Sequence, residues 1–285
     1  MIRYRKKLPF KVRLLIVFAI AAAAVFAAIT AVYLAGYRYI TCHRLNGTDV
    51  KFVGKVDKEG KPLSGMIIYP DMSRAKVSYP DGKIEYSSGA SYTGGLSVTY
   101  ERDGEGTMTF ANGDRYTGHF TADVIDGKGR YEYASGDVYE GDFVMGVKEG
   151  TGKYVYADGE TYEGGFSADM RNGTGRMTKP DGTEYEGDYV FGIKNGKGIY
   201  RFANGDVYEG DFSLDMRHGQ GKYTWANGES YEGEFSENNI NGYGTYTWVE
   251  GRASYTGYFE NGTIVLVSPD GSTGEGSGSG DGPAE

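Results

Sequence analysis

The 285-residue chain contains 47 glycines and 26 tyrosines but only 7 prolines. Collagen is excluded because glycine does not recur at every third position, and regularly spaced aromatic residues disfavour simple disorder. Residues 1–44 hold eight Arg or Lys and no carboxylate, so a net charge of −9 leaves −17 on the other 241 residues. Nucleic-acid binding is therefore not expected, since it depends largely on Lys and Arg that neutralise phosphates.

Residues 14–37 form an uncharged and almost wholly apolar segment. As a helix it would extend roughly 36 Å, and the hydrocarbon core of a bilayer is about 30 Å thick. A secretory signal peptide is the alternative, but its apolar region usually has only about 7–15 residues, and no clear small-x-small cleavage site closes this segment. The segment therefore predicts an uncleaved transmembrane helix that places the protein in the membrane.

The charges on either side of this segment predict its orientation. Six Arg or Lys lie within the basic segment 1–13, whereas only Arg38 and Arg44 follow the helix closely. Positive charge is enriched on the cytoplasmic side of membrane proteins. We therefore expect a single-pass protein with a cytoplasmic N-terminus and the rest of the chain on the outer, non-cytoplasmic side.

A repeat of about 23 residues follows. The motif Tyr-x-Gly recurs at intervals of 23 or 24 residues, and a Gly-x-Gly motif lies between successive copies. The tyrosines of the first motif are Tyr92, Tyr116, Tyr139, Tyr162, Tyr185, Tyr208, Tyr231 and Tyr255. Two motifs in constant register indicate an array of structural repeats, each one supersecondary unit.

Each repeat has the pattern of a β-hairpin. In the copy that starts at Tyr208, residues Tyr208, Gly210 and Phe212 alternate with Glu209 and Asp211, which point to the opposite face of a strand. The second half alternates in the same way, and the repeats are joined by Asn-Gly, Asp-Gly or Ser-Gly pairs typical of tight turns. The pattern predicts a meander with one aromatic-plus-glycine face and one polar face.

Glycines at fixed strand positions call for a structural cause, because glycine inside a strand costs roughly 0.5–1 kcal/mol relative to alanine. Gly210 and Gly221 are examples. We expect the missing side chains to leave slots in which aromatic rings from neighbouring strands lie flat.

The ends of the array are irregular. Within the juxtamembrane segment 38–91, FVGKV from Phe52 and SGMIIY around Gly65 resemble degenerate half-repeats. The array proper is assigned to residues 92–267, and NGTIVLV from Asn261 is expected to form a closing strand. Residues 268–285 form a tail rich in Gly and Ser, for which disorder is predicted.

The assembled motif, YEGxF followed by GxG and a DG or NG turn, resembles the membrane occupation and recognition nexus (MORN) repeat. YEGDFVMGVKEGTGKYVYADGE at Tyr139 and YEGDFSLDMRHGQGKYTWANGE at Tyr208 are among the most similar units, whereas Thr replaces Glu after Tyr92, Tyr116 and Tyr255. The resemblance implies an all-β repeat fold: an elongated, single-layer antiparallel β-meander of hairpins, here preceded by one transmembrane α-helix. It also implies a role in membrane association, scaffolding or dimerisation.

No motif for catalysis or cofactor binding is present, including the P-loop, HExxH, CxxC, GxSxG and protein-kinase motifs. We expect no catalytic residues, cofactor or metal, and hence no enzyme. Carboxylates such as Glu140, Glu163 and Glu209 recur on the polar face and are interpreted as a solvated surface, with weak cation binding as the alternative.

The aromatic face is the candidate binding site, because an uncovered apolar surface usually marks an interaction site. Its rings would either pack as the core or contact a partner. The candidate residues are Tyr116, Phe120, Tyr139, Phe143, Tyr162, Phe166, Tyr185, Tyr189, Tyr208, Phe212, Trp225, Tyr231, Phe235 and Trp248.

These features predict a membrane-anchored, non-enzymatic scaffold or interaction module. Through its aromatic face it would bind a protein partner, either a helix or an extended peptide, or associate with itself. Recognition of a cell-envelope glycan by the same face is the main alternative, with sugar rings stacked on Tyr and Trp. Lipid recognition is a further alternative, disfavoured by the acidic charge of the repeats.

Overall fold

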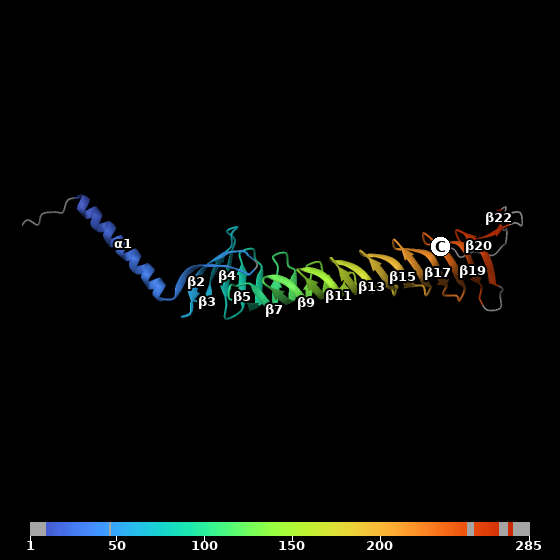
Figure 1. Cartoon of the computed structure of the whole chain (residues 1–285), viewed down its shortest axis with the longest axis horizontal. Helices are drawn as coiled ribbons and strands as arrows, with labels where there is room; N and C mark the ends of the chain where they lie inside the picture. The colour runs from blue at the N-terminus through green and yellow to red at the C-terminus, as the bar shows by residue number, and fades with distance from the viewer. Residues whose placement is uncertain (1–9, 46, 250–253, 268–272, 276–285) are drawn as a thin grey trace, which may run out of the picture. The chain divides into compact units, whose positions relative to one another are not determined.

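The computed structural model describes residues 10–45, 47–249, 254–267 and 273–275, which form one helix and 22 strands (Figure 1). The chain divides into two compact units. Unit 1 comprises the chain as far as Asn112 together with His119–Val124, and unit 2 comprises Gly113–Gly118 and the chain from Ile125 onward.

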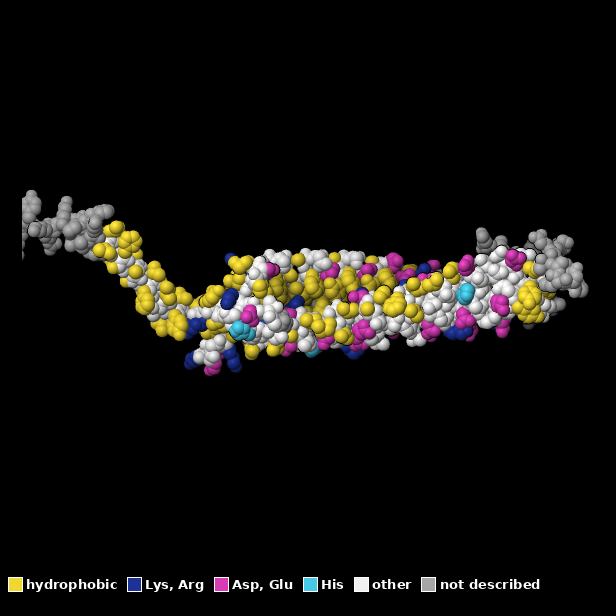
Figure 2. Space-filling model, turned by 45° about the horizontal axis from the view of Figure 1, so that its top comes forward, with side chains coloured by type: hydrophobic (Ala, Val, Ile, Leu, Met, Phe, Trp, Pro, Cys, Tyr) yellow, Lys and Arg dark blue, Asp and Glu magenta, His cyan; other side chains and the backbone are white. Residues whose placement is uncertain are grey.

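Helix α1 (Phe10–Leu34) begins and ends earlier than the apolar segment 14–37. Gly36 has a φ of 87° and Tyr37 already belongs to a strand, which explains why the helix stops at Leu34. The described side chains of the helix, at residues 14, 15 and 17–34, are exposed, and Figure 2 shows apolar side chains along the face in view. Val17–Leu34 is long and apolar enough to cross a membrane, although a signal sequence would satisfy the same criteria.

Unit 1 is an antiparallel meander in which each strand pairs with the next. Its strands are β1 (Tyr37–Cys42), β2 (Val50–Val56), β3 (Pro62–Ile68), β4 (Arg74–Ser78), β5 (Lys83–Tyr86), β6 (Ser91–Leu96) and β7 (Arg102–Thr109), and the end of β8 (Arg115–Thr121) also belongs to it.

Unit 2 begins with the first residues of β8 and continues as a regular series of hairpins. A strand of seven residues alternates with a strand of nine in most repeats. The strands are β9 (Val124–Glu132), β10 (Val138–Val144), β11 (Val147–Val155), β12 (Thr161–Ser167), β13 (Met170–Thr178), β14 (Glu184–Val190), β15 (Ile193–Arg201), β16 (Val207–Ser213), β17 (Met216–Thr224), β18 (Ser230–Ser236), β19 (Asn239–Thr247), β20 (Ser254–Glu260), β21 (Thr263–Val267) and β22 (Thr273–Glu275).

The turn inside each hairpin is formed by two residues with positive φ, as at Leu214 (52°) and Asp215 (67°). Two positive φ angles are characteristic of the type I′ turn, whose twist matches that of antiparallel strands. Positive φ is unfavourable for a bulky residue such as leucine, so these turns were not evident from the sequence. The Asn-Gly pairs close the other set of turns, those that join one repeat to the next, as at Gly205.

A tyrosine ring covers a pair of glycines in each regular repeat. Gly210 and Gly221 face each other on β16 and β17. A Cβ atom at Gly221 would lie 2.5 Å from the Cε2 atom of Tyr208. The expected slots therefore exist: for Gly221 the ring comes from the neighbouring strand, as expected, and for Gly210 it comes from the glycine's own strand.

The aspartate of the YEGD motif stabilises the same region. The Tyr208 hydroxyl donates a hydrogen bond to the carbonyl oxygen of Asp211 at 2.8 Å. The strand pairing shifts register between Gly210 and Phe212, and the Asp211 carboxylate accepts the N–H of Gln220 at 3.0 Å. Ring and carboxylate together hold the bulge in this strand.

The core consists of edge-to-face aromatic pairs that link successive repeats. The ring of Tyr208 lies 5.2 Å from that of Phe212 in its own repeat and 5.0 Å from that of Phe235 in the next. Such pairs contribute about 0.5–1.5 kcal/mol each beyond the burial of their surface. The predicted fold class, an all-β meander of repeat hairpins after one helix, is confirmed.

The irregular ends use variations of the same packing. In unit 1, Phe52 takes the position of the repeat tyrosine over the paired glycines Gly54 and Gly65. At the other end of the chain, Thr273–Glu275 forms β22 and pairs with β21. The prediction of disorder is therefore wrong for these three residues, and the rest of 268–285 lies outside the described residues.

Candidate interaction groove

The structure divides the predicted aromatic site into two groups. Trp225 and Trp248 are half-buried. The other twelve are at most 5% exposed and make up the core, so they are not available to a partner at the surface: Tyr116, Phe120, Tyr139, Phe143, Tyr162, Phe166, Tyr185, Tyr189, Tyr208, Phe212, Tyr231 and Phe235. The half-buried rings at the surface of the array lie on or next to the second strands of most hairpins.

Six second-strand rings in unit 2 form a continuous ladder, which we call the aromatic wall. Neighbouring ring centroids are 4.5–5.6 Å apart. The wall consists of Tyr200, Phe202, Tyr223, Trp225, Tyr246 and Trp248. Sequence analysis had selected only the two tryptophans from this set.

Carboxylates at the repeat-joining turns fix two of the three tyrosines of the wall. The Tyr223 hydroxyl donates to Asp206 at 2.6 Å, and the Tyr246 hydroxyl donates to Glu229 at 2.8 Å. Burial, together with the carboxylate partner, raises the pKa of both phenols above the usual value, so both rings are neutral donors at neutral pH. The wall is therefore held in place before any ligand arrives.

The wall borders a groove of about 630 Å³. Phe202 and Trp225 line it from the wall, and Arg217, Asn238 and Ile240 line it from the other side. A volume of this size is within the range of ligand sites, which combine apolar surface with a few polar groups. The groove can therefore hold a ligand segment against the aromatic wall.

A row of four cations repeats every 23 residues: Lys148, Arg171, Lys194 and Arg217. We call them the groove cations because the row ends at Arg217, which lines the groove, while the other three occupy the equivalent positions of the preceding repeats. Each stands two residues before a Gly-x-Gly motif, and each charged group lies 5.0–5.2 Å from the centroid of an aromatic ring. Cations within about 6 Å of a ring face are stabilised by it. The sequence analysis missed this row, although its constant position relative to the glycines was a usable signal.

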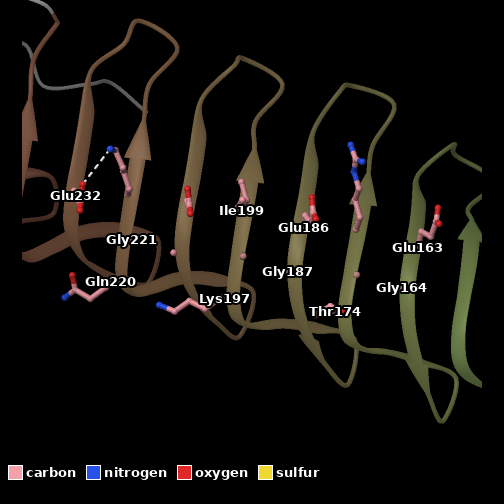
Figure 3. A pocket seen from close by; sticks show the side chains of 16 residues that line it. Glu163, Gly164, Thr174, Glu186, Gly187, Lys197, Ile199, Gln220, Gly221 and Glu232 are labelled. Atoms are coloured by element: carbon pink, nitrogen blue, oxygen red, sulfur yellow. Dashed lines mark ion pairs between the residues drawn. The ribbon is translucent and has the colours of Figure 1, made fainter.

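The opposite, polar face of unit 2 has a different character (Figure 3). Glu163, Glu186, Glu209 and Glu232 lie on successive hairpins of a broad, shallow depression of about 1140 Å³. Lysines stand between these carboxylates, as Lys222 does at 3.7 Å from Glu232. Among the residues that the structure describes, no cluster of His, Cys, Asp and Glu could hold a metal ion.

Seven consecutive segments of the chain match the MORN repeat family, at residues 101–115, 116–138, 139–161, 162–184, 185–207, 208–230 and 231–251. The chain belongs to the MORN repeat family. The matched residues, 101–251, lie within the array of 92–267 that was expected from the sequence. A search of curated proteins gives no match.

Among solved structures, the chain is similar to the TCP domain of SAS-4 from Drosophila melanogaster, in complex with a proline-rich motif of Ana2, with 16% identity and a TM-score of 0.36. That likeness covers 62% of this chain and 88% of the other. The wild-type TCP10 domain of CPAP from Danio rerio has 12% identity and a TM-score of 0.36, over 69% of this chain and 94% of that domain.

Proposed function

We propose that this MORN repeat protein is a membrane-anchored interaction module, without catalytic activity of its own, that holds an extended segment of a protein partner in the groove of unit 2. The observation that carries the proposal is the aromatic wall. Four of its six rings, Tyr200, Phe202, Trp225 and Trp248, are half-buried, whereas Tyr223 and Tyr246 are buried, and the six rings are continuous over three repeats. Rigid aromatic side chains contribute most to binding because they bury large surfaces at low entropic cost.

Affinity purification of the full chain from its own membranes tests this proposal. A groove variant, Tyr200→Ser with Trp225→Ser, is compared with a polar-face variant, Ile199→Ser with Lys222→Ser. Loss of two wall rings is expected to reduce the recovery of a groove-bound partner by more than about tenfold, which corresponds to about 1.4 kcal/mol. The polar-face variant should recover the partner as the wild type does. Equal recovery by all three proteins would exclude the groove.

A glycan of the cell envelope is a second candidate, favoured by the composition of the groove. Trp225 lies in it together with Asp206, Asn238 and Asn239. An aromatic face next to hydrogen-bonding side chains suits a sugar ring as well as a peptide. Retention of the full chain by purified cell-wall material, lost in the groove variant alone, would favour this candidate over a protein partner.

The membrane anchor and its orientation are part of the proposal. The helix α1 is apolar on all sides and exposed over its whole described surface, which suits a lipid environment. An epitope at the C-terminus should be removed by protease added to intact cells, while a cytoplasmic control protein survives. Protection of the epitope until lysis would reverse the orientation, and release of the repeats into the medium would identify a cleaved signal sequence.

A further inference from the structure

The groove cations have a regular spacing that a ligand can match. Neighbouring strands in a sheet lie about 4.8 Å apart, so two strands per repeat separate successive groove cations by about 9.6 Å. Lys148, Arg171, Lys194 and Arg217 occupy four consecutive repeats of unit 2 and extend beyond the aromatic wall toward its N-terminal end. They therefore form a basic row in the part of the chain after residue 44, whose 241 residues carry a net charge of −17.

Among the described residues, two of these cations lack a carboxylate at ion-pair distance, although the Asp206 carboxylate still interacts electrostatically with Arg217. Lys148 and Lys194 lie 3.7 and 4.0 Å from the turn carboxylates Asp169 and Asp215. Arg171 and Arg217 each donate to a backbone carbonyl at an adjacent turn, and no described carboxylate lies within 4.0 Å of either. A partly buried guanidinium without a counter-ion retains a desolvation cost that a bound anion would offset.

Desolvation is also evident at the lysine between these two arginines. The side chain of Lys194 is 16% exposed, and burial lowers the pKa of its ammonium group despite the nearby Asp215. A lowered pKa means that the charged form is disfavoured where it stands. A ligand carboxylate close to Lys194 would reverse this effect.

The spacing distinguishes between conformations of a peptide ligand. In a β-strand, side chains on one face recur every two residues, or about 6.6 Å, which does not match the row. In a polyproline II helix, three residues advance about 9.3 Å and return to the same face. That advance is within about 0.3 Å of the repeat of unit 2, so the match persists over four repeats.

We propose that unit 2 binds an extended acidic peptide in the polyproline II conformation, which lies in the groove at Arg217 and continues along the row of groove cations, with a carboxylate at every third residue facing these cations and apolar residues facing the aromatic wall. This inference rests on the proposed function and specifies the chemistry of the partner. Polyproline II segments suit aromatic-lined grooves because they are already extended and lose little entropy on binding.

Synthetic peptides test the inference with the full chain in detergent micelles. The probe has four Glu-Pro-Pro repeats, and the comparison peptides have Gln in place of Glu or one extra proline in each repeat. The two tryptophans of the chain, Trp225 and Trp248, both lie on the wall, so their fluorescence reports directly on occupancy. Binding of the Glu-Pro-Pro peptide should be at least about tenfold tighter than that of either comparison peptide.

Matched variants show whether the groove cations are responsible. Arg171→Gln with Arg217→Gln should weaken the Glu-Pro-Pro peptide at least tenfold, whereas Arg176→Gln with Lys222→Gln on the polar face should not change it. A charge-reversed variant separates loss of charge from misfolding. Arg171→Glu with Arg217→Glu should bind a peptide of Lys-Pro-Pro repeats more tightly than the Glu-Pro-Pro peptide. Equal binding of the Glu and Gln peptides, or no binding of any peptide, would overturn this inference, while the affinity purification decides separately whether the groove binds a protein.

Discussion

The two units use the same repeat position differently. In unit 1, Arg102 stands two residues before its Gly-x-Gly motif and pairs with Asp123 at 3.1 Å. Arg44, which reaches in from the segment between β1 and β2, shares that carboxylate and donates to the carbonyl oxygen of Tyr100. In unit 2, Arg217 has the equivalent position, but Asn238 replaces the turn aspartate.

The difference indicates that the cation two residues before a Gly-x-Gly motif can either form an ion pair within the protein or, as we propose for unit 2, bind an anionic ligand. In unit 1, Arg102 pairs with the Asp123 carboxylate, and Arg44 binds the same carboxylate. The cation at this position is therefore already neutralised within the protein. Unit 2 keeps the cation and omits the carboxylate at Arg171 and Arg217. The predictions below test the shared packing first and then the contrast between the units.

The largest expected effect is alkaline unfolding, which should act on both units. Burial raises the pKa of Tyr92 in unit 1 and of Tyr162 in unit 2 to about 12. An unfolded tyrosine ionises near about pH 10. Since the folded pKa is the higher one, stability should be complete below about pH 10 and decrease as the pH rises toward 12. Melting temperatures from circular dichroism across this range, at constant salt, will show whether the decrease starts there.

Gly221→Val should be the most damaging single substitution in unit 2. Its side chain would collide with the Tyr208 ring, so we expect a loss of about 3 kcal/mol or more. Thr224→Val, on the opposite face of the same strand, should change the stability by less than about 1 kcal/mol. Thermal melts that give equal losses for the two variants would refute the slot packing.

Removal of Arg44 should be more costly than removal of Arg171. The Arg44 side chain is 4% exposed and forms an ion pair with Asp123, so Arg44→Met should reduce the stability by about 2–3 kcal/mol. The loss is smaller than for an unpaired buried carboxylate, because Arg102 still pairs with Asp123. Arg171→Met loses two cation–π contacts, a hydrogen bond to a backbone carbonyl and a weak one to a methionine sulfur, about 1 kcal/mol in total. Urea unfolding measures the loss of stability in each variant. A larger loss for Arg171→Met than for Arg44→Met would contradict this prediction.

The smallest expected effect is a gain of stability at a hairpin turn. Leu214 has a φ of 52° and is 66% exposed, so its side chain adds strain without much burial. Leu214→Asn should stabilise the protein by up to about 1 kcal/mol, because Asn tolerates this conformation. Ser213→Asn, at the neighbouring strand residue, serves as the control and should bring no gain in the melting temperature.

The hairpins and their alternation were predictable from sequence because period-two patterning and constant glycine positions repeat many times. The strand that supplies the ring over each glycine pair was not predictable, because the contact of Tyr208 with Gly210 of its own strand exists only in the folded structure. The site was predictable in part. Spacing identified the aromatic face but not which rings are buried, because Tyr208 and Trp225 have similar chemistry and differ in strand. The contact of Arg44 with Asp123, 79 residues apart, left no local pattern.

Site-specific photo-crosslinking tests the central claim most directly. A photoreactive amino acid is introduced at Trp225 on the aromatic wall or at Lys222 on the polar face, three residues apart on or next to β17. After irradiation of intact cells, the crosslinked peptide is identified by mass spectrometry. If the groove of unit 2 is the interaction site, position 225 will yield one defined adduct with a partner and position 222 will yield none. An adduct at position 222 alone, or equal adducts at both positions, would contradict the account.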